Sequence, residues 1–196
     1  MTKPIVPARM PRRDVLSSNA EESRLRKIWF RVAAIALAAS GGIAVAETAV
    51  DPTAVKSENG KYLDKEGNPT FKVGSDGTVD WYTYSGFRRY HSECHVCHGP
   101  DGMGSTYAPA LKDSLKATSY ADFLGVVAIG RKNVSSSQDN VMPGFGDNRN
   151  VVCYLDDIYV YLRARASDAV PRGRPAKHED KPPAAQKAED ACMAQK

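Results

Sequence analysis

The segment HSECHVCHG, residues 91–99, places two cysteines and a histidine within five consecutive positions. Cys94 and Cys97 are separated by two residues and His98 follows directly, which is the C-x-x-C-H spacing of covalent haem attachment. Two intervening residues let both sulfurs reach neighbouring vinyl groups of one porphyrin. The adjacent histidine can then offer its imidazole to the iron. The spacing therefore predicts one covalently bound haem c, held by Cys94, Cys97 and His98.

Two other uses of a C-x-x-C pair suit this chain less well. A thioredoxin-like redox pair requires a β-α-β context, and no such pattern surrounds residues 94–97. A zinc ribbon requires a second close pair of cysteines, whereas the remaining two, Cys153 and Cys192, stand far apart in the chain. Haem attachment is the interpretation that the sequence favours.

The presence of a second axial ligand decides whether the iron is six-coordinate or has an open coordination position. A methionine opposite the histidine suits electron transfer, whereas an open position suits an enzyme or a gas-binding module. Three methionines follow His98, of which Met103 is too close along a glycine-rich turn and Met193 lies in a polar tail. Met142 lies 44 residues after His98, and Pro143 favours an extended backbone there. We expect Met142 to bind the iron rather than only to fill a gap in the core.

The other histidines are not expected to bind the iron. His95 lies between the two attachment cysteines, His91 lies on the incoming helix and His178 lies in the C-terminal tail. A solvated or capping role is the simpler interpretation for each of them. The alternative to Met142 ligation is a haem enzyme or gas-binding module with an open or displaceable sixth position, although no His or Arg stands beside Met142 for such chemistry.

Residues 28–46 read IWFRVAAIALAASGGIAVA, an apolar stretch that basic residues precede and that ends in a small-x-small motif. Because its core is short and rich in Ala and Gly, it predicts a secretory signal peptide over residues 1–46 rather than a membrane span. Cleavage is expected after Ala46. Export would deliver the chain to the periplasm, where disulfides can form.

The predicted leader changes the charge of the chain. It contains eight of the 27 Lys and Arg and three of the 23 Asp and Glu, so 19 basic and 20 acidic residues remain. The formal charge of +4 then becomes about −1. A nearly neutral chain gives no support for binding to nucleic acid or to an anionic membrane. The remaining residues, about 150, suffice for one small domain with tails.

Residues 47–82 are expected to form an N-terminal arm and extension. The polar segment 47–56 predicts a loose arm. Residues 70–73 and 78–82 have a strand-like composition and are expected to pair as a β-hairpin around Asp76-Gly77.

Residues 83–166 are expected to form a helical domain. Apolar residues recur at helical spacing, and Ser119 and Asp122 occupy N-cap and N3 positions. The expected helices are residues 84–93, 119–131 and 148–166. Residues 167–196 are rich in Pro, Ala and charge, which predicts an extended or disordered tail.

The helical region resembles the class I cytochromes c. In that family a glycine and an aromatic residue on the first helix pack closely against the last helix. The corresponding residues here are Gly86 and Tyr90 on the first helix and Tyr159 and Leu162 on the last. The resemblance implies an all-α fold of about three to five helices wrapped around one covalent haem, here with a β-hairpin extension and an extended tail.

The resemblance extends to the residues around the predicted haem. CHGPDGMG, residues 97–104, is similar to the bacterial post-haem turn, and MPGF, residues 142–145, is similar to the methionine-ligand loop. Pro109 matches the proline whose carbonyl accepts a hydrogen bond from the ligand histidine, here the Nδ1–H of His98.

Longer stretches, residues 81–115, 153–166 and 172–182, look like the four-cysteine c-type cytochromes of methylotrophic bacteria. Those cytochromes are associated with PQQ-dependent methanol dehydrogenases, which often contain a lanthanide. The resemblance implies a periplasmic one-electron carrier, not an enzyme. Its donor would be such a dehydrogenase, and its acceptor another cytochrome c or a terminal oxidase.

Haem attachment leaves Cys153 and Cys192 unexplained. The chain has an even number of cysteines, four, and an exposed free thiol is a liability in an exported protein. We therefore expect a Cys153–Cys192 disulfide that ties the tail back across the domain, around the hairpin extension. The alternative is one buried thiol and one unpaired cysteine in the tail.

Overall fold

The computed structural model describes residues 51–134 and 139–195, all within the second of the two units into which the chain divides, Glu47–Lys196. The predicted signal peptide and its cleavage site after Ala46 lie outside the described residues. In chain order, the described elements are β1 (Lys56–Glu58), β2 (Lys61–Leu63), β3 (Pro69–Thr70), α2 (Trp81–Glu93), α3 (His95–His98), the 3-10 helix η2 (Pro100–Gly102), α4 (Leu111–Ser114), α5 (Tyr120–Ile129), β4 (Arg131–Val134), β5 (Asp139–Met142), α6 (Arg149–Val152), α7 (Leu155–Ala166) and α8 (Pro183–Met193).

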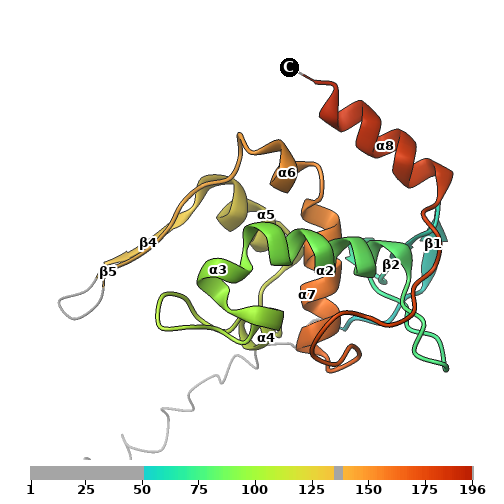
Figure 1. The fold of residues 1–196 in the computed structure, drawn as a ribbon, viewed down its shortest axis with the longest axis horizontal. Coiled ribbons are helices and arrows are strands. Elements are labelled where there is room, and N and C mark those ends of the chain that lie inside the picture. Colours follow the sequence, from blue (N-terminus) through green and yellow to red (C-terminus); the bar gives the residue numbers. More distant parts are fainter. Residues whose placement is uncertain (1–50, 135–138, 196) are drawn as a thin grey trace, which may run out of the picture. The chain divides into compact units, whose positions relative to one another are not determined.

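The structure is mostly helical, with two small antiparallel sheets (Figure 1). The all-α expectation is therefore right for the dominant class of element. The β structure expected in the N-terminal extension is present, but as a three-stranded sheet at other residues, and the β4–β5 pair was not expected. The first sheet has the order β1-β2-β3, with Ser57 opposite Tyr62. The second pairs β4 with β5 and places Arg131 opposite Met142. Within residues 51–134 and 139–195, none of the helices has the length and apolar character to cross a membrane.

Helices α2 and α7 pack against each other at the centre of the fold (Figure 1). Gly86 marks their closest approach, because a Cβ added there would lie 2.5 Å from the carbonyl carbon of Asp157 and 2.8 Å from Cβ of Tyr161. Both distances are shorter than any normal carbon–carbon contact, so only glycine allows this crossing. The main core cluster surrounds it and consists of Tyr90, Leu115, Phe123, Val127, Val151, Ile158, Tyr159, Tyr161, Leu162 and Ala166.

Tyr159 and Leu162, the expected partners of Gly86 and Tyr90, share the main core cluster with Tyr90, but they are not the residues nearest to Gly86. Residues 157 and 161, four positions apart, share the face of α7 that meets α2. Tyr159 lies on another face and packs on Tyr120 and Phe123 of α5, with ring centroids 4.9 and 5.2 Å apart. Leu162 instead approaches Gly102, where an added Cβ would be 3.3 Å from its Cδ2.

The start of α2 explains why the predicted hairpin of residues 70–73 and 78–82 is shorter than expected. Asp80 is the N-cap of α2, and its carboxylate accepts hydrogen bonds from the Thr83 backbone N–H at 2.9 Å and hydroxyl at 2.6 Å. The chain therefore enters a helix at Trp81, where a second strand was expected. The two segments still pair around Gly77 over a short length, through an antiparallel bridge between Val73 and Val79 and flanking backbone hydrogen bonds of 2.8 and 3.0 Å.

The N-terminal arm is fastened to α7, contrary to the expectation that residues 47–56 are loose. Arg163 of α7 forms a 2.7 Å ion pair with Asp64, and both side chains are almost fully buried. The same guanidinium donates to the Asp51 carbonyl at 2.6 Å, and the Thr70 hydroxyl donates to the Pro52 carbonyl at 2.6 Å. Removing one partner of such a buried pair would leave an uncompensated charge, so the arm is an integral part of the fold from residue 51 onward. Residues 47–50 lie outside the described part.

The predicted helices of the domain are found with shifted limits. The cap of α5 is confirmed, because Ser119 Oγ accepts from the Asp122 N–H at 3.1 Å. The long helix expected over residues 148–166 is instead two helices, α6 and α7, which Cys153 and Tyr154 separate. Tyr154 has non-helical dihedral angles, and its buried ring lies 3.5 Å from the guanidinium carbon of Arg89. This contact with α2 favours the break over a continuous helix.

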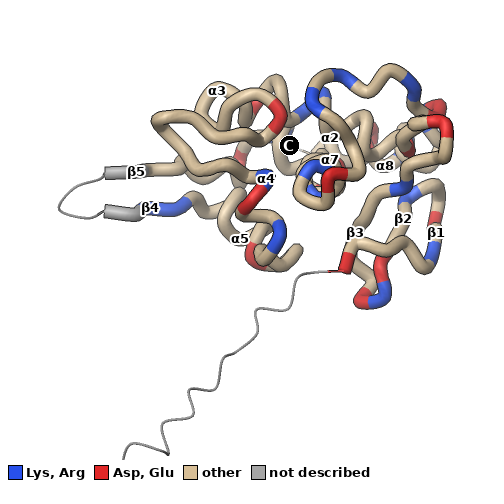
Figure 2. The backbone as a smooth tube through the Cα atoms, turned by 90° about the horizontal axis from the view of Figure 1, so that it is seen from below, with Lys and Arg blue, Asp and Glu red and all other residues tan. Residues whose placement is uncertain are grey.

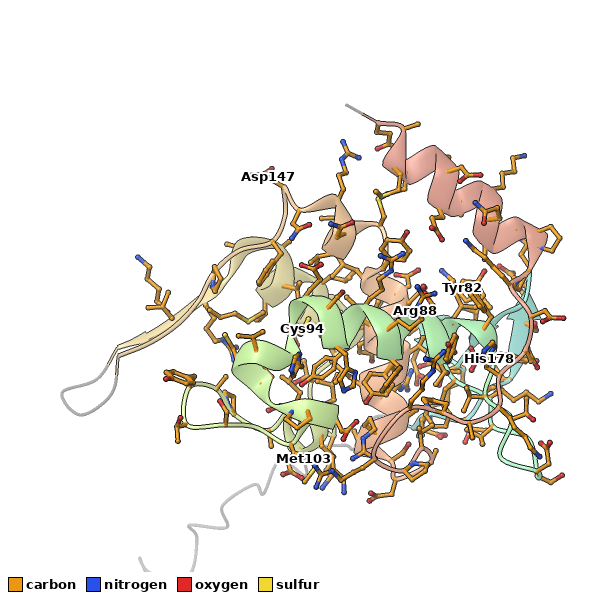
Figure 3. All side chains as sticks on the ribbon, in the orientation of Figure 1. Tyr82, Arg88, Cys94, Met103, Asp147 and His178 are labelled. Atoms are coloured by element: carbon orange, nitrogen blue, oxygen red, sulfur yellow. A yellow bond between two sulfur atoms is a disulfide. The ribbon has the colours of Figure 1, made fainter. Side chains whose placement is uncertain are left out.

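The tail is ordered along α2, so the expectation of an extended or disordered segment is wrong for α8 and for its approach. Val79 donates to the Lys177 carbonyl at 3.2 Å and accepts from the Glu179 N–H at 2.9 Å, which makes a short parallel bridge. Cys153 and Cys192 form a disulfide (Figure 3). Contacts that are distant in sequence therefore hold a segment whose composition alone would leave it unfolded.

Candidate haem-binding site

The C-x-x-C-H segment forms a single helical turn directly after α2. The His98 N–H donates to the Cys94 carbonyl at 3.1 Å, and the Cys97 N–H donates to the same carbonyl at 3.3 Å. The turn therefore gathers two thiols and one imidazole. Cys94 and Cys97 are not disulfide-bonded; Cys97 is exposed, while Cys94 packs against the main core cluster. Burial raises the pKa of the Cys94 thiol to about 12, an environment that suits a neutral thioether.

His98 is buried, with only 7% of its surface exposed. Its Nδ1 lies 3.1 Å from the Pro109 carbonyl oxygen. Because a carbonyl only accepts, Nδ1 carries the proton and the Nε2 lone pair is left for a metal. The loop that brings Pro109 to this position begins with a 2.8 Å hydrogen bond from the Gly104 N–H to the His98 carbonyl.

Residues 98–104, called the post-haem turn from here on, are held by a hydroxyl group from α2. Tyr90 OH donates to the Gly99 carbonyl at 2.5 Å, lies 3.3 Å from the His98 carbonyl and accepts from the Gly102 N–H at 3.1 Å. The sequence indicated Tyr90 only as an aromatic ring that packs between two helices, and a phenylalanine ring could pack there equally well. No local pattern reveals the role of its hydroxyl.

Met142 is the last residue of β5, and its segment is fastened to the C-terminal end of α5. Phe145 donates to the Val127 carbonyl at 2.9 Å, and Gly146 donates to the Ala128 carbonyl at 3.0 Å. Gly130 permits this approach, since a Cβ there would lie 2.5 Å from the Met142 carbonyl oxygen. Met142 is half-buried and packs against the main core cluster, as Cys94 does.

The other sequence candidates have different surroundings. Met103 is 42% exposed, and its sulfur lies 3.7 Å from an Arg165 nitrogen. Nδ1 of His91 and Nδ1 of His95 each lie 2.8 Å from a backbone carbonyl one helical turn earlier. His178 stacks on Tyr84 with ring centroids 3.7 Å apart, beside the N-terminal half of α2, whereas Cys94 lies at the other end of that helix (Figure 3).

The residues of this site fit a covalent haem. One helical turn presents two unpaired thiols and an imidazole of defined tautomer, and a methionine borders the same apolar cluster as Cys94. The aromatic and aliphatic side chains of that cluster suit a large apolar ring system. This donor set, one histidine and one methionine with two cysteines for attachment, matches the chemistry of c-type haem.

A mostly helical fold around a C-x-x-C-H turn defines a class, that of the c-type haem proteins. No protein-family model matches the chain. The chain is 52% identical to cytochrome c-553I of Paracoccus denitrificans over 158 residues, which are 81% of this chain and 70% of that protein. It is also 41% identical to cytochrome c-555 of Methylococcus capsulatus over 96 residues, 48% of this chain and 72% of that protein.

The fold is similar to a solved structure. The crystal structure of the c-type cytochrome XoxG from Methylobacterium extorquens AM1 matches with a TM-score of 0.67 and 57% sequence identity. The match covers 76% of this chain and 94% of that chain. The chain belongs to the c-type cytochromes, which carry electrons on haem c and are not enzymes.

Proposed function

We propose that this cytochrome is a periplasmic single-haem carrier that accepts electrons one at a time from a PQQ-dependent methanol dehydrogenase. It passes them to another cytochrome c or to a terminal oxidase. Cys94 and Cys97 hold the haem, and His98 and Met142 bind its iron. The observation that best supports this ligand set is the 3.1 Å contact between His98 Nδ1 and the Pro109 carbonyl, because it prepares Nε2 for a metal.

The bound haem supplies reversible one-electron chemistry at iron. His98 and Met142 would hold the iron, and the chain fixes the segments that carry them, because the post-haem turn is held by Tyr90 and the Met142 segment is held by the end of α5. Fixed ligands leave little to rearrange when the charge of the iron changes, which favours rapid electron transfer.

Electrons would enter and leave at the edge of the haem near the attachment cysteines. Cys97 is exposed, and 73% of the surface of Val96 is accessible to solvent. Lys and Arg are interspersed with Asp and Glu across the described residues rather than gathered on one side (Figure 2). Encounter with a partner should therefore depend only moderately on salt, since no large field of one sign steers it.

The choice of donor is supported by the resemblance of residues 81–115, 153–166 and 172–182 to the cytochromes of methylotrophic bacteria. The similarity to XoxG of Methylobacterium extorquens AM1 points in the same direction. Periplasmic location is supported by the leader pattern of residues 1–46. If that segment is removed as proposed, the N-terminal residue of the holoprotein from a periplasmic extract is Glu47.

Stopped-flow reduction by purified PQQ dehydrogenases tests the donor. Ferric holoprotein is mixed with a methanol dehydrogenase and methanol, or with a PQQ dehydrogenase for other alcohols and its own substrate. Faster reduction by the methanol enzyme is expected. Equal or faster reduction by the other enzymes would contradict methanol dehydrogenase as the donor.

The visible spectrum tests the ligand set independently of the donor. A band near the red end of the ferric spectrum that disappears on reduction reports a methionine–iron bond. Binding of CO to the ferrous wild-type protein would instead support the open site of an enzyme or gas-binding module.

A further inference from the structure

Asp101 adopts an unusual backbone conformation in the post-haem turn. It lies within η2, three residues after His98, with φ at 59° and only 5% of its surface exposed. The left-handed region favours glycine, and a non-glycine residue there requires support from its surroundings. The contacts of the Asp101 side chain must therefore supply this support.

The carboxylate of Asp101 binds the C-terminal tail. Its Oδ1 accepts from the Gly173 N–H at 3.0 Å, and its Oδ2 lies 3.4 Å from Arg172 Nε. Tyr161 OH of α7 and His91 Nε2 of α2 each lie 3.4 Å from Oδ1. Burial opposes ionisation, but the Gly173 N–H, Arg172 and the charges of His91 and Arg165 together lower the pKa of Asp101, so it is a carboxylate at neutral pH.

Arg165 connects the same turn to the beginning of the tail. This buried side chain donates from Nε to the Asp101 carbonyl at 3.2 Å and from Nη1 to the Val170 carbonyl. One arginine of α7 thus holds both the post-haem turn and the residue from which the tail departs. The two segments cannot move independently without breaking these bonds.

The tail beyond Gly173 is fixed to other parts of the protein. Arg174 donates to Tyr84 OH, and His178 stacks on the Tyr84 ring. At its end, Cys192 is bonded to Cys153. The tail is therefore anchored on both sides of its backbone bridge to Val79, and Asp101 is the point at which it touches the post-haem turn.

The opposite side of the turn is held by Tyr90, which bonds the Gly99 carbonyl and the Gly102 N–H on either side of Asp101. The Gly104 N–H closes the turn on the His98 carbonyl. A displacement of Asp101 is thereby transmitted to the backbone of His98. We propose that Asp101 is a positioning residue that couples the anchored C-terminal tail to the orientation of the His98 imidazole. This inference rests on the proposed role of His98 as an iron ligand.

Two substitutions in the holoprotein separate this role from a simple effect of charge. Asp101→Asn and Asp101→Gly both remove the negative charge, so any electrostatic effect on the haem is common to them. Asparagine keeps an acceptor oxygen for the Gly173 N–H, whereas glycine keeps the backbone conformation and loses the acceptor. Asp168→Gly is the matched control, because Asp168 has nearly the same φ, 58°, but is exposed and pairs with Lys112 instead.

Trypsin cleavage of the Arg172–Gly173 bond measures release of the tail, and hyperfine-shifted proton resonances of the His98 ring in the ferric protein measure its orientation. In Asp101→Gly we expect cleavage to be about fivefold faster than in Asp101→Asn, as the loss of one neutral hydrogen bond implies, together with displaced His98 resonances. Asp168→Gly should match the wild type in both measurements.

The possible results separate the inference from the ligand assignment. Equal cleavage rates and equal His98 resonances in Asp101→Gly and Asp101→Asn would overturn the inference alone, as would a released tail with unmoved His98 resonances. Moved resonances with an intact tail would overturn it too, because Asp101 would then act on the turn by itself. Absence of shifted His98 resonances in the wild type would overturn the ligand assignment and the inference with it.

Discussion

Replacing Gly86 by alanine tests whether the crossing of α2 and α7 governs the stability of the fold. The added methyl carbon would lie 2.5 Å from the Asp157 carbonyl carbon and 2.8 Å from Tyr161 Cβ. Normal contacts between carbons are about 3.5 to 4 Å, so the helices would have to separate by about 1 Å. The obstacle is largely the backbone of a neighbouring helix, which cannot rotate away as a flexible side chain can.

The expected cost follows from two opposing contributions. Overpacking of this kind costs about 3 kcal/mol at the upper end of its usual range. Alanine is intrinsically better than glycine inside a helix by about 1 kcal/mol, which offsets part of that cost. We expect Gly86→Ala to lower the free energy of unfolding by about 2 kcal/mol. Guanidinium unfolding of the ferric holoprotein, followed by far-UV circular dichroism, would show a lower midpoint with an unchanged slope.

Gly125 provides a matched control inside α5. No heavy atom lies within 4 Å of a Cβ added at that position, so only the helix preference should act. Gly125→Ala should therefore raise the free energy of unfolding by about 0.5 to 1 kcal/mol, opposite in sign to the effect at Gly86. The reasoning is refuted if Gly86→Ala is as stable as the wild type, or if the two variants shift the midpoint in the same direction.

Three further predictions concern titration, ligation and the disulfide. Burial raises the pKa of Asp157 from its ordinary value to about 7, so the folded protein holds a proton on this carboxyl more tightly than the unfolded chain does. The stability that this difference gives is complete below about pH 4 and is lost as the pH rises through 7. The free energy of unfolding of Asp157→Asn, relative to that of the wild type, should therefore rise by up to about 4 kcal/mol between about pH 4 and about pH 8. Chemical unfolding at both pH values measures this difference, and an equal difference at the two pH values would contradict the prediction. Met142→Ala should leave the haem covalently attached, lower the reduction potential and open the ferrous iron to CO, and an unchanged spectrum and potential would refute the ligand assignment. Thiol titration of the denatured, unreduced holoprotein should find no free thiol, because the haem occupies two cysteines and a disulfide joins Cys153 to Cys192; two titratable thiols would show that the tail is not bridged.

Features that depend on neighbouring residues were readable from the sequence. The C-x-x-C-H spacing lies within one turn of helix, so its geometry follows from the local backbone alone. The cap of α5 depends only on Ser119 and Asp122, three positions apart. Met142 was selected by elimination, and the extended backbone that Pro143 favours is the one that β5 has.

Features that depend on distant residues were missed or misplaced. The tail has a composition typical of disorder, but it becomes ordered because Val79, Tyr84, Asp101 and Cys153 bind it from other parts of the chain. The N-terminal arm was expected to be loose because nothing within it indicates the buried Arg163 that holds it. The hairpin is shorter than expected because strand-like residues such as Trp81 can also begin a helix once Asp80 caps it.

The sequence by itself therefore predicted the chemistry of this cytochrome: the side chains proposed to hold the haem and, through the family resemblance, the ring nitrogen left for iron and the class of fold. The tertiary structure alone decided how the supporting segments are arranged, including the face of α7 that meets Gly86 and the contact of the tail with Asp101. The physical reason is the range of the interactions. Attachment and capping act over one helical turn, whereas burial, ion pairs and the disulfide join residues that are close only after the chain has folded.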